Sequence, residues 1–123
     1  MKKPLDENTP MAYSTAMLIL ETSVFTKRIS DCMSEDVYRE LQSHLISNPG
    51  AGDIILGGGG LRKIRWAGSG RGKRGGTRVI YYWWVPDQLM MLFAYKKNEA
   101  SDLTPSQVKQ LRLIVEEWLH EKE

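Results

Sequence analysis

The sequence between Leu61 and Tyr82, LRKIRWAGSGRGKRGGTRVIYY, decides the fold because it contains two strand patterns joined by a glycine-rich segment. Successive side chains of a β-strand point to opposite faces of the sheet. The first six residues therefore place Ile64 and Trp66 on one face and Lys63 and Arg65 on the other. We expect two cations side by side on an open face.

The second pattern, Thr77–Trp84, is β-branched and aromatic and predicts another strand. Glycines between the two strands are typical of a long hairpin connection. One face of the second strand would carry Arg78, Ile80, Tyr82 and Trp84. The tip of the connection would carry Arg71, Lys73 and Arg74.

Positive charge is concentrated in this same stretch. It holds seven of the 17 Lys and Arg residues, and no Asp or Glu occurs between Asp53 and Asp87. The other ten basic residues are outnumbered by the 15 acidic residues of the chain. The seven are Arg62, Lys63, Arg65, Arg71, Lys73, Arg74 and Arg78. Such a local positive field predicts a phosphate-bearing partner.

Length and composition fit one domain. A chain of 123 residues with 41% hydrophobic residues is large enough for a single core. We expect residues 1–16 to be a flexible arm and residues 17–123 to form the domain. The N-terminus lacks the apolar segment of a secretory signal, and no apolar run reaches the roughly 20 residues of a membrane span. These features predict a cytoplasmic protein.

The elements that precede the basic hairpin are a strand and two helices. The apolar run that begins at Met17 predicts a strand buried on both faces. Ser23 and Ser34 are candidate N-caps of the two helices, and Pro49 with its neighbouring glycine ends the second.

After the hairpin, Leu89–Tyr95 predicts a third consecutive antiparallel strand, central in the sheet by its apolar content. Thr104, Pro105 and Gln107 mark the start of a C-terminal helix. The expected fold class is α+β, an antiparallel sheet with two N-terminal helices and a C-terminal helix packed on it.

The sequence contains no complete pattern of a nucleotide-binding or metal-binding site. Gly70-x-Gly72-x-x-Gly75 matches a dinucleotide-binding pattern, but a strand rather than a helix is expected after it. His44 and His120 have no Cys or acidic cluster at ligand spacing, so we expect no metal and no cofactor.

The arrangement resembles the RelE/ParE superfamily of bacterial type II toxins, most closely the HigB-like, RelE-type mRNA interferases. The segments that carry the resemblance are Gly60–Arg65, Gly72–Tyr82, Lys96–Glu99 and Asp102-Leu103. The resemblance implies a RelE-like microbial RNase fold and ribosome-dependent cleavage of mRNA. It also implies a cognate antitoxin that usually carries a helix-turn-helix, so that operator DNA is bound only through the antitoxin.

The resemblance carries over to individual positions. Lys63 and Arg65 match the family's basic strand, and Arg78 matches an arginine of the next strand. Where relatives often carry an arginine and then a catalytic aromatic, this chain has Asn98 and then Leu103 and Thr104. The candidate catalytic residues are Lys63, Arg65, Arg78, Lys97 and Asn98. The candidate RNA-binding residues are Arg62, Arg71, Lys73, Arg74, Lys96 and Tyr82.

The implied reaction is attack of an RNA 2′-hydroxyl on its own 3′-phosphate. A lysine whose pKa is lowered by neighbouring cations can act as acid or base, and Lys63 and Lys97 are the candidates. Arginine keeps its proton, and its planar fork suits the charge of the transition state. Arg65 and Arg78 are the expected stabilisers, with Arg78 exposed on the sheet surface.

Two other functions remain open at this level. One is a ParE-like gyrase-inhibiting toxin on the same fold, which does not require cations at the centre of the sheet. The other is a non-catalytic RNA- or ribosome-binding module that uses the basic connection between the strands.

Overall fold

The computed structural model describes residues 17–67, 76–84 and 86–121. Its elements, in chain order, are β1 (Leu18–Glu21), α2 (Ser23–Cys32), α3 (Glu35–Ser47), β2 (Asp53–Ile54), β3 (Leu61–Trp66), β4 (Thr77–Trp84), β5 (Gln88–Lys96) and α4 (Pro105–Glu121). The expected arm of residues 1–16 and the basic tip with Arg71, Lys73 and Arg74 lie outside the described residues.

The strands form one five-stranded sheet in the order β1-β5-β4-β3-β2. The consecutive strands β3, β4 and β5 are antiparallel neighbours, which confirms the predicted hairpin and the third strand after it. Strand β1 pairs in parallel with β5 and makes the sheet mixed. The expected α+β class is confirmed.

The two edge strands differ from the sequence prediction. Strand β1 was expected to be buried on both faces, but it lies at an edge and the Leu18 side chain is 54% exposed. That prediction is wrong because a run of four apolar residues does not show whether the strand lies inside the sheet or at its edge, where side chains are less covered. At the opposite edge lies β2, which has two residues and was not predicted.

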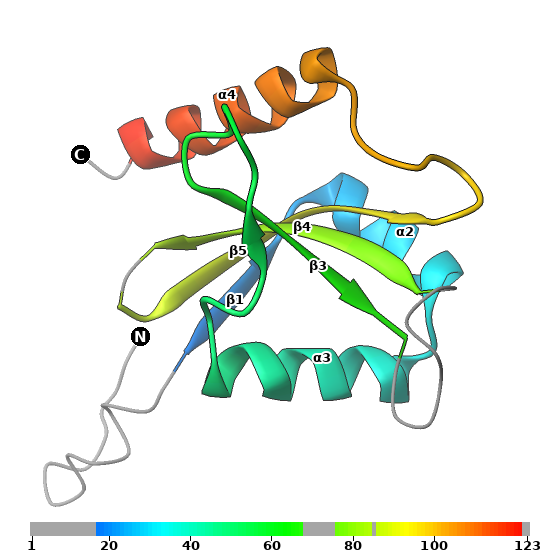
Figure 1. The fold of residues 1–123 in the computed structure, drawn as a ribbon. Coiled ribbons are helices and arrows are strands. Elements are labelled where there is room, and N and C mark those ends of the chain that lie inside the picture. The colour runs from blue at the N-terminus through cyan, green and yellow to red at the C-terminus, as the bar shows by residue number, and fades with distance from the viewer. Residues whose placement is uncertain (1–16, 68–75, 85, 122–123) are drawn as a thin grey trace, which may run out of the picture.

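Helices cover both faces of the sheet (Figure 1). On one face, Phe25 of α2 and Leu41 of α3 pack in a buried cluster with Val79 of β4. On the other face, Leu111 of α4 packs in a second cluster with Ile80, the neighbour of Val79 in the same strand. The alternation of side chains along β4 therefore divides the core into two layers.

Caps fix where the helices begin. Thr22, and not the expected Ser23, caps α2, because its Oγ1 accepts a hydrogen bond from the Phe25 amide. The predicted Ser34 cap of α3 is confirmed by a bond from the Val37 amide. Thr104 and Gln107 form the predicted reciprocal capping box before α4. Shifting a cap by one residue leaves the helix in place.

None of the helices in the described part of the chain combines the length and apolar character needed to cross a membrane.

Tyr81 of β4 connects the sheet to the loop after α3. Its ring is fully buried, and its hydroxyl donates to the Pro49 carbonyl at 2.7 Å and accepts from the Gly52 amide at 2.9 Å. A Cβ on Gly52 would lie 2.8 Å from the Tyr81 ring, so only glycine fits there without a shift. The ring therefore positions the backbone that leads into β2.

Replacing Tyr81 by Phe is expected to lower the free energy of unfolding by about 1–3 kcal/mol, because a buried amide and carbonyl lose their partner. Urea unfolding measures this. Tyr38→Phe is the matched control, since its hydroxyl donates to Glu21 at an exposed site where water can replace the bond. A Tyr81→Phe protein as stable as the parent would show that the loop is held by other contacts.

Candidate functional site

Arg65, Arg78 and Tyr95 lie in one row across the three central strands. Arg65 of β3 is the direct partner of Arg78 on β4, and Arg78 is the direct partner of Tyr95 on β5. Directly opposed side chains lie about 5 Å apart on the same face of a sheet. Lys63, two residues before Arg65, shares that face. The structure thus brings together the three predicted cations Lys63, Arg65 and Arg78, which we call the basic cluster.

Burial of Arg78 differs from expectation. Arg65 is exposed, as expected, but Arg78 is only 5% exposed. Its Nη1 donates to the carbonyl of Gly76, the residue before β4, at 3.0 Å. The expectation of an exposed Arg78 is wrong because β4 lies inside the sheet, where the side chains of Arg65 and Tyr95 flank Arg78 on its own face. Neither arginine forms an ion pair with a described residue.

Lys63 has an acidic partner that sequence reasoning missed. Asp102 lies in residues 97–104 between β5 and α4, a segment we call the linker, and its Oδ1 is 3.0 Å from Lys63 Nζ. The same Oδ1 accepts from the Leu103 amide at 2.8 Å. The Lys63 hydrogen bond, the Leu103 amide and the charge of Arg78 hold the pKa of Asp102 below its ordinary value. The carboxylate is therefore ionised at neutral pH.

This ion pair changes the environment that the sequence suggested for Lys63. A lysine surrounded only by cations was the premise for its role as acid or base. Here one side of the ammonium contacts a carboxylate, while Arg65 and Arg78 lie on the same face of the sheet. Lys63 is therefore best described as a held hydrogen-bond donor.

Tyr95 brings a buried hydroxyl to the cluster. The residue is 2% exposed, and its hydroxyl lies close to the Asp102 carboxylate without a well-formed hydrogen bond to any described residue. Burial raises the pKa of Tyr95 above its ordinary value, and the negative charge of Asp102 raises it further, while Arg78 and Arg65 lower it. A neutral phenol thus lies beside the buried arginine, with its proton retained at neutral pH.

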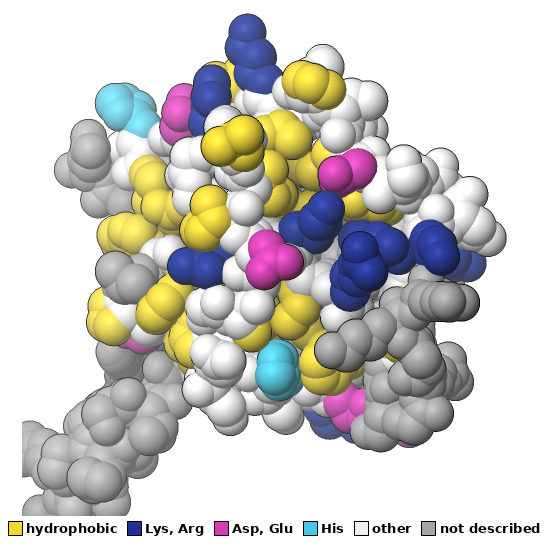
Figure 2. Space-filling view, viewed as in Figure 1, with side chains coloured by type: hydrophobic (Ala, Val, Ile, Leu, Met, Phe, Trp, Pro, Cys, Tyr) yellow, Lys and Arg dark blue, Asp and Glu magenta, His cyan; other side chains and the backbone are white. Residues whose placement is uncertain are grey.

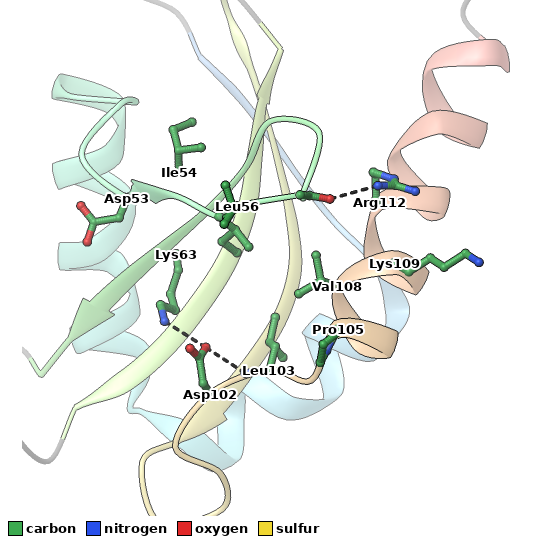
Figure 3. Close-up of a pocket in the computed structure, with 12 residues that line it drawn as sticks. Asp53, Ile54, Leu56, Lys63, Asp102, Leu103, Pro105, Val108, Lys109 and Arg112 are labelled. Atoms are coloured by element: carbon green, nitrogen blue, oxygen red, sulfur yellow. Dashed lines mark hydrogen bonds and ion pairs between the residues drawn. The ribbon is translucent and has the colours of Figure 1, made fainter.

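A groove of about 580 Å³ opens beside the cluster (Figure 3). Lys63 and Asp102 line it together with β2, the residues that follow β2, and the first turns of α4. The space-filling view shows Lys and Arg side chains gathered on this side of the molecule, with isolated acidic side chains near them (Figure 2). The cluster therefore combines exposed positive charge with a hollow next to it.

Comparison with protein-family models matches residues 23–123 to a family described as the RelE toxin of the RelE / RelB toxin-antitoxin system. The match covers most of the chain, from the start of α2 through α4. The chain belongs to the RelE toxin family. It is accordingly the toxin component of a toxin–antitoxin system, and a cognate antitoxin is its partner.

Other predicted residues of this RelE-family toxin lie apart from the basic cluster. Arg62 is on the opposite face of β3, where its Nη1 donates to the Gly50 carbonyl at 3.1 Å and the Gly52 carbonyl at 2.8 Å. Tyr82 packs against the core on the α4 side. Both side chains thus have structural contacts that the sequence did not reveal.

The end of β5 gives the RelE-family toxin further polar groups. Lys96 is half-buried, and its backbone amide donates to the Glu99 carboxylate at 2.8 Å. Lys97 and Asn98 are exposed in the turn that follows, and neither makes a side-chain hydrogen bond or ion pair with a described residue. The structure therefore does not join these two residues to the basic cluster.

Proposed function

We propose that this toxin is a ribosome-dependent mRNA endoribonuclease that inhibits translation in the cytoplasm, as in the HigB-like branch that the sequence resembles. The observation that carries the proposal is the direct pairing of Arg65 with Arg78 at the centre of the sheet, with Lys63 on the same face. Three cations on one rigid surface suit a phosphate whose charge increases in the transition state. A binding function alone does not require a buried arginine among them.

The proposed reaction is attack of the RNA 2′-oxygen on the adjacent 3′-phosphorus. A new bond forms between the 2′-oxygen and phosphorus, and the bond from phosphorus to the 5′-oxygen of the next nucleotide breaks. The products are a 2′,3′-cyclic phosphate and a free 5′-hydroxyl. Such a step needs one group to accept the 2′ proton, donors for the phosphorane charge, and one group to give a proton to the leaving oxygen.

We assign the following roles to the residues of the site. Arg65 and Arg78 present guanidinium groups to the phosphate, and the planar fork binds two oxygens at once. Lys63, whose Nζ lies 3.0 Å from Asp102 Oδ1, is the proposed proton donor to the leaving oxygen. The 2′ proton is proposed to pass to water, and Lys97 and Asn98 in the turn after β5 are proposed to contact the RNA at the rim of the sheet.

Two further contacts are proposed, one with the RNA backbone and one with the antitoxin. The basic residues Arg71, Lys73 and Arg74 are expected to supply affinity for ribosomal or messenger RNA backbone rather than catalysis. The antitoxin is expected to carry a helix-turn-helix domain, so operator DNA is bound only through it.

Expression of the chain alone is expected to arrest growth, and co-expression of its antitoxin is expected to relieve the arrest. Primer extension on cellular mRNA should then show new 5′ ends phased with codons in translated regions. Intact mRNA accompanied by DNA damage would instead indicate a gyrase inhibitor, and arrest with neither lesion would indicate a non-catalytic RNA-binding module. Normal growth at high levels of the folded chain would contradict the toxin function itself.

A further inference from the structure

Asp102 is oriented by its own backbone surroundings. Its Oδ1 accepts from the Leu103 amide, which belongs to the next residue of the chain, and also from Lys63 Nζ on β3 (Figure 3). The first bond fixes the carboxylate in the linker before any partner arrives. Asp102 is thus a pre-oriented acceptor that reaches across to the sheet.

Lys63 needs such a partner more than the arginines do. Its four-carbon stem is flexible, and the like charges of Arg65 and Arg78 on the same face repel its ammonium. Arg78 is held by the Gly76 carbonyl, whereas the one contact of the Lys63 ammonium with a described residue is Asp102. Without that carboxylate, the ammonium would move away from the other cations.

The ion pair leaves Lys63 available to a ligand. A lysine ammonium has three N–H donors, and Asp102 accepts one of them. The Lys63 side chain is 24% exposed and lines the groove beside the cluster. An RNA phosphate can therefore approach the remaining donors without displacing the carboxylate.

Asp53 does not share this role. It is the direct partner of Lys63 across β2 and β3, and it lines the same groove. However, it forms no ion pair with a described residue, and Figure 3 shows its carboxylate directed away from the Lys63 ammonium. The linker, rather than the edge strand, supplies the acid that contacts Lys63.

We propose that Asp102 is a positioning residue, which holds the Lys63 ammonium beside Arg65 and Arg78 so that it meets the scissile phosphate. The inference rests on the proposed nuclease function and deepens it, because it assigns to the linker after β5 a part in the reaction. Asp102 acts through Lys63 and does not itself touch the RNA.

Asp102→Asn is expected to lower kcat for cleavage of ribosome-bound mRNA by about ten- to hundredfold, because a displaced donor loses its alignment with the leaving oxygen. KM is expected to stay the same or to rise. Asp102→Glu, which retains the charge, should recover part of the lost turnover. Multiple-turnover cleavage over a range of programmed-ribosome concentrations gives kcat and KM for the parent and for both variants.

A double-mutant cycle separates positioning from general destabilisation. In a Lys63→Gln background, Asp102→Asn is expected to have no further effect on kcat, because the group it positions is gone. Glu99→Gln is the matched control. Glu99 lies in the same linker, accepts from the Lys96 amide at 2.8 Å and pairs with Arg28 at 2.8 Å, so it makes the same two kinds of contact outside the cluster. In the Glu99→Gln background, Asp102→Asn should keep its full effect on kcat, because Glu99 does not position Lys63.

Two results would overturn the assignment. If Asp102→Asn lowers KM while kcat stays at the parental value, the carboxylate competes with RNA and does not position Lys63. If Asp102→Asn has its full effect in the Lys63→Gln background, it acts by another route.

Failure of the nuclease function is recognised separately. If the parental toxin leaves mRNA intact, growth arrest is measured for the same four proteins of the cycle. Asp102→Asn is again expected to have no further effect in the Lys63→Gln background.

The side-chain ammonium NMR signal of Lys63 gives a readout that needs no activity. It should move or broaden in Asp102→Asn and stay in place in Glu99→Gln, and an unchanged signal in Asp102→Asn would contradict the proposal.

Discussion

Arg78→Ala is expected to abolish toxicity, with cleavage of ribosome-bound mRNA reduced about 100-fold or more. Removing one pre-organised donor to the transition state typically costs on the order of 3 kcal/mol in the barrier. Arg78 is the partner of both Arg65 and Tyr95 in the central row, so its loss leaves a gap between the other groups of the site. Toxicity on induction and single-turnover cleavage measure the effect.

Because Arg78 is almost fully buried, the alanine variant is also expected to be less stable, by about 1–3 kcal/mol, since the Gly76 carbonyl loses its donor. Arg78→Lys separates the two effects. It retains the charge and most of the stem, so its urea unfolding should be closer to that of the parent. A point charge cannot replace the bidentate fork, and most of the cleavage rate should still be lost.

Two controls frame this experiment. Arg65→Ala removes an exposed member of the same cluster and should lower cleavage with little change in unfolding. Arg39→Ala removes an exposed arginine of α3, paired with Asp36, and should change neither quantity. Parental cleavage rates in both Arg78 variants would exclude the proposed role of the central row.

An mRNA with a 2′-deoxy sugar at the scissile position is expected to bind the toxin on the ribosome and to remain intact. The proposed nucleophile is the 2′-oxygen of that nucleotide, so the substitution removes the attacking atom and leaves the phosphate for the basic cluster. The same substitution one nucleotide away should be cut at the normal rate. Cleavage of the scissile-deoxy substrate would show that water or a protein group is the nucleophile.

The order of the central strands and of the helices could be predicted because each of these elements has a recognisable pattern in a short stretch of sequence. Thr104 and Gln107 predict the start of α4 from four residues. The alternation in β3 places Lys63 and Ile64 on opposite faces of the sheet before the neighbouring strands are known. Short-range patterns were sufficient for these features.

The rest of the site depends on contacts between distant parts of the chain. Asp102 reaches Lys63 across 39 residues, and no local period predicts that meeting. In the sequence Tyr95 is one more large residue of a central apolar strand, and no local pattern shows that its hydroxyl lies near Asp102 and Arg78. The burial of Arg78 likewise depends on the strands that flank it.

The parallel pairing of β1 with β5 sets the order in which the chain can fold during its synthesis. Leu18 pairs with Gln88, and Thr22 donates to the Leu92 carbonyl across 70 residues. Helices α2 and α3 leave the exit tunnel long before the strand that covers them, since Phe25 and Leu41 share a core with Met91. The nascent toxin therefore exposes that apolar face until the late strand has been translated. A protein proposed to cleave mRNA on the ribosome thus completes its own sheet only after β5 has left the ribosome.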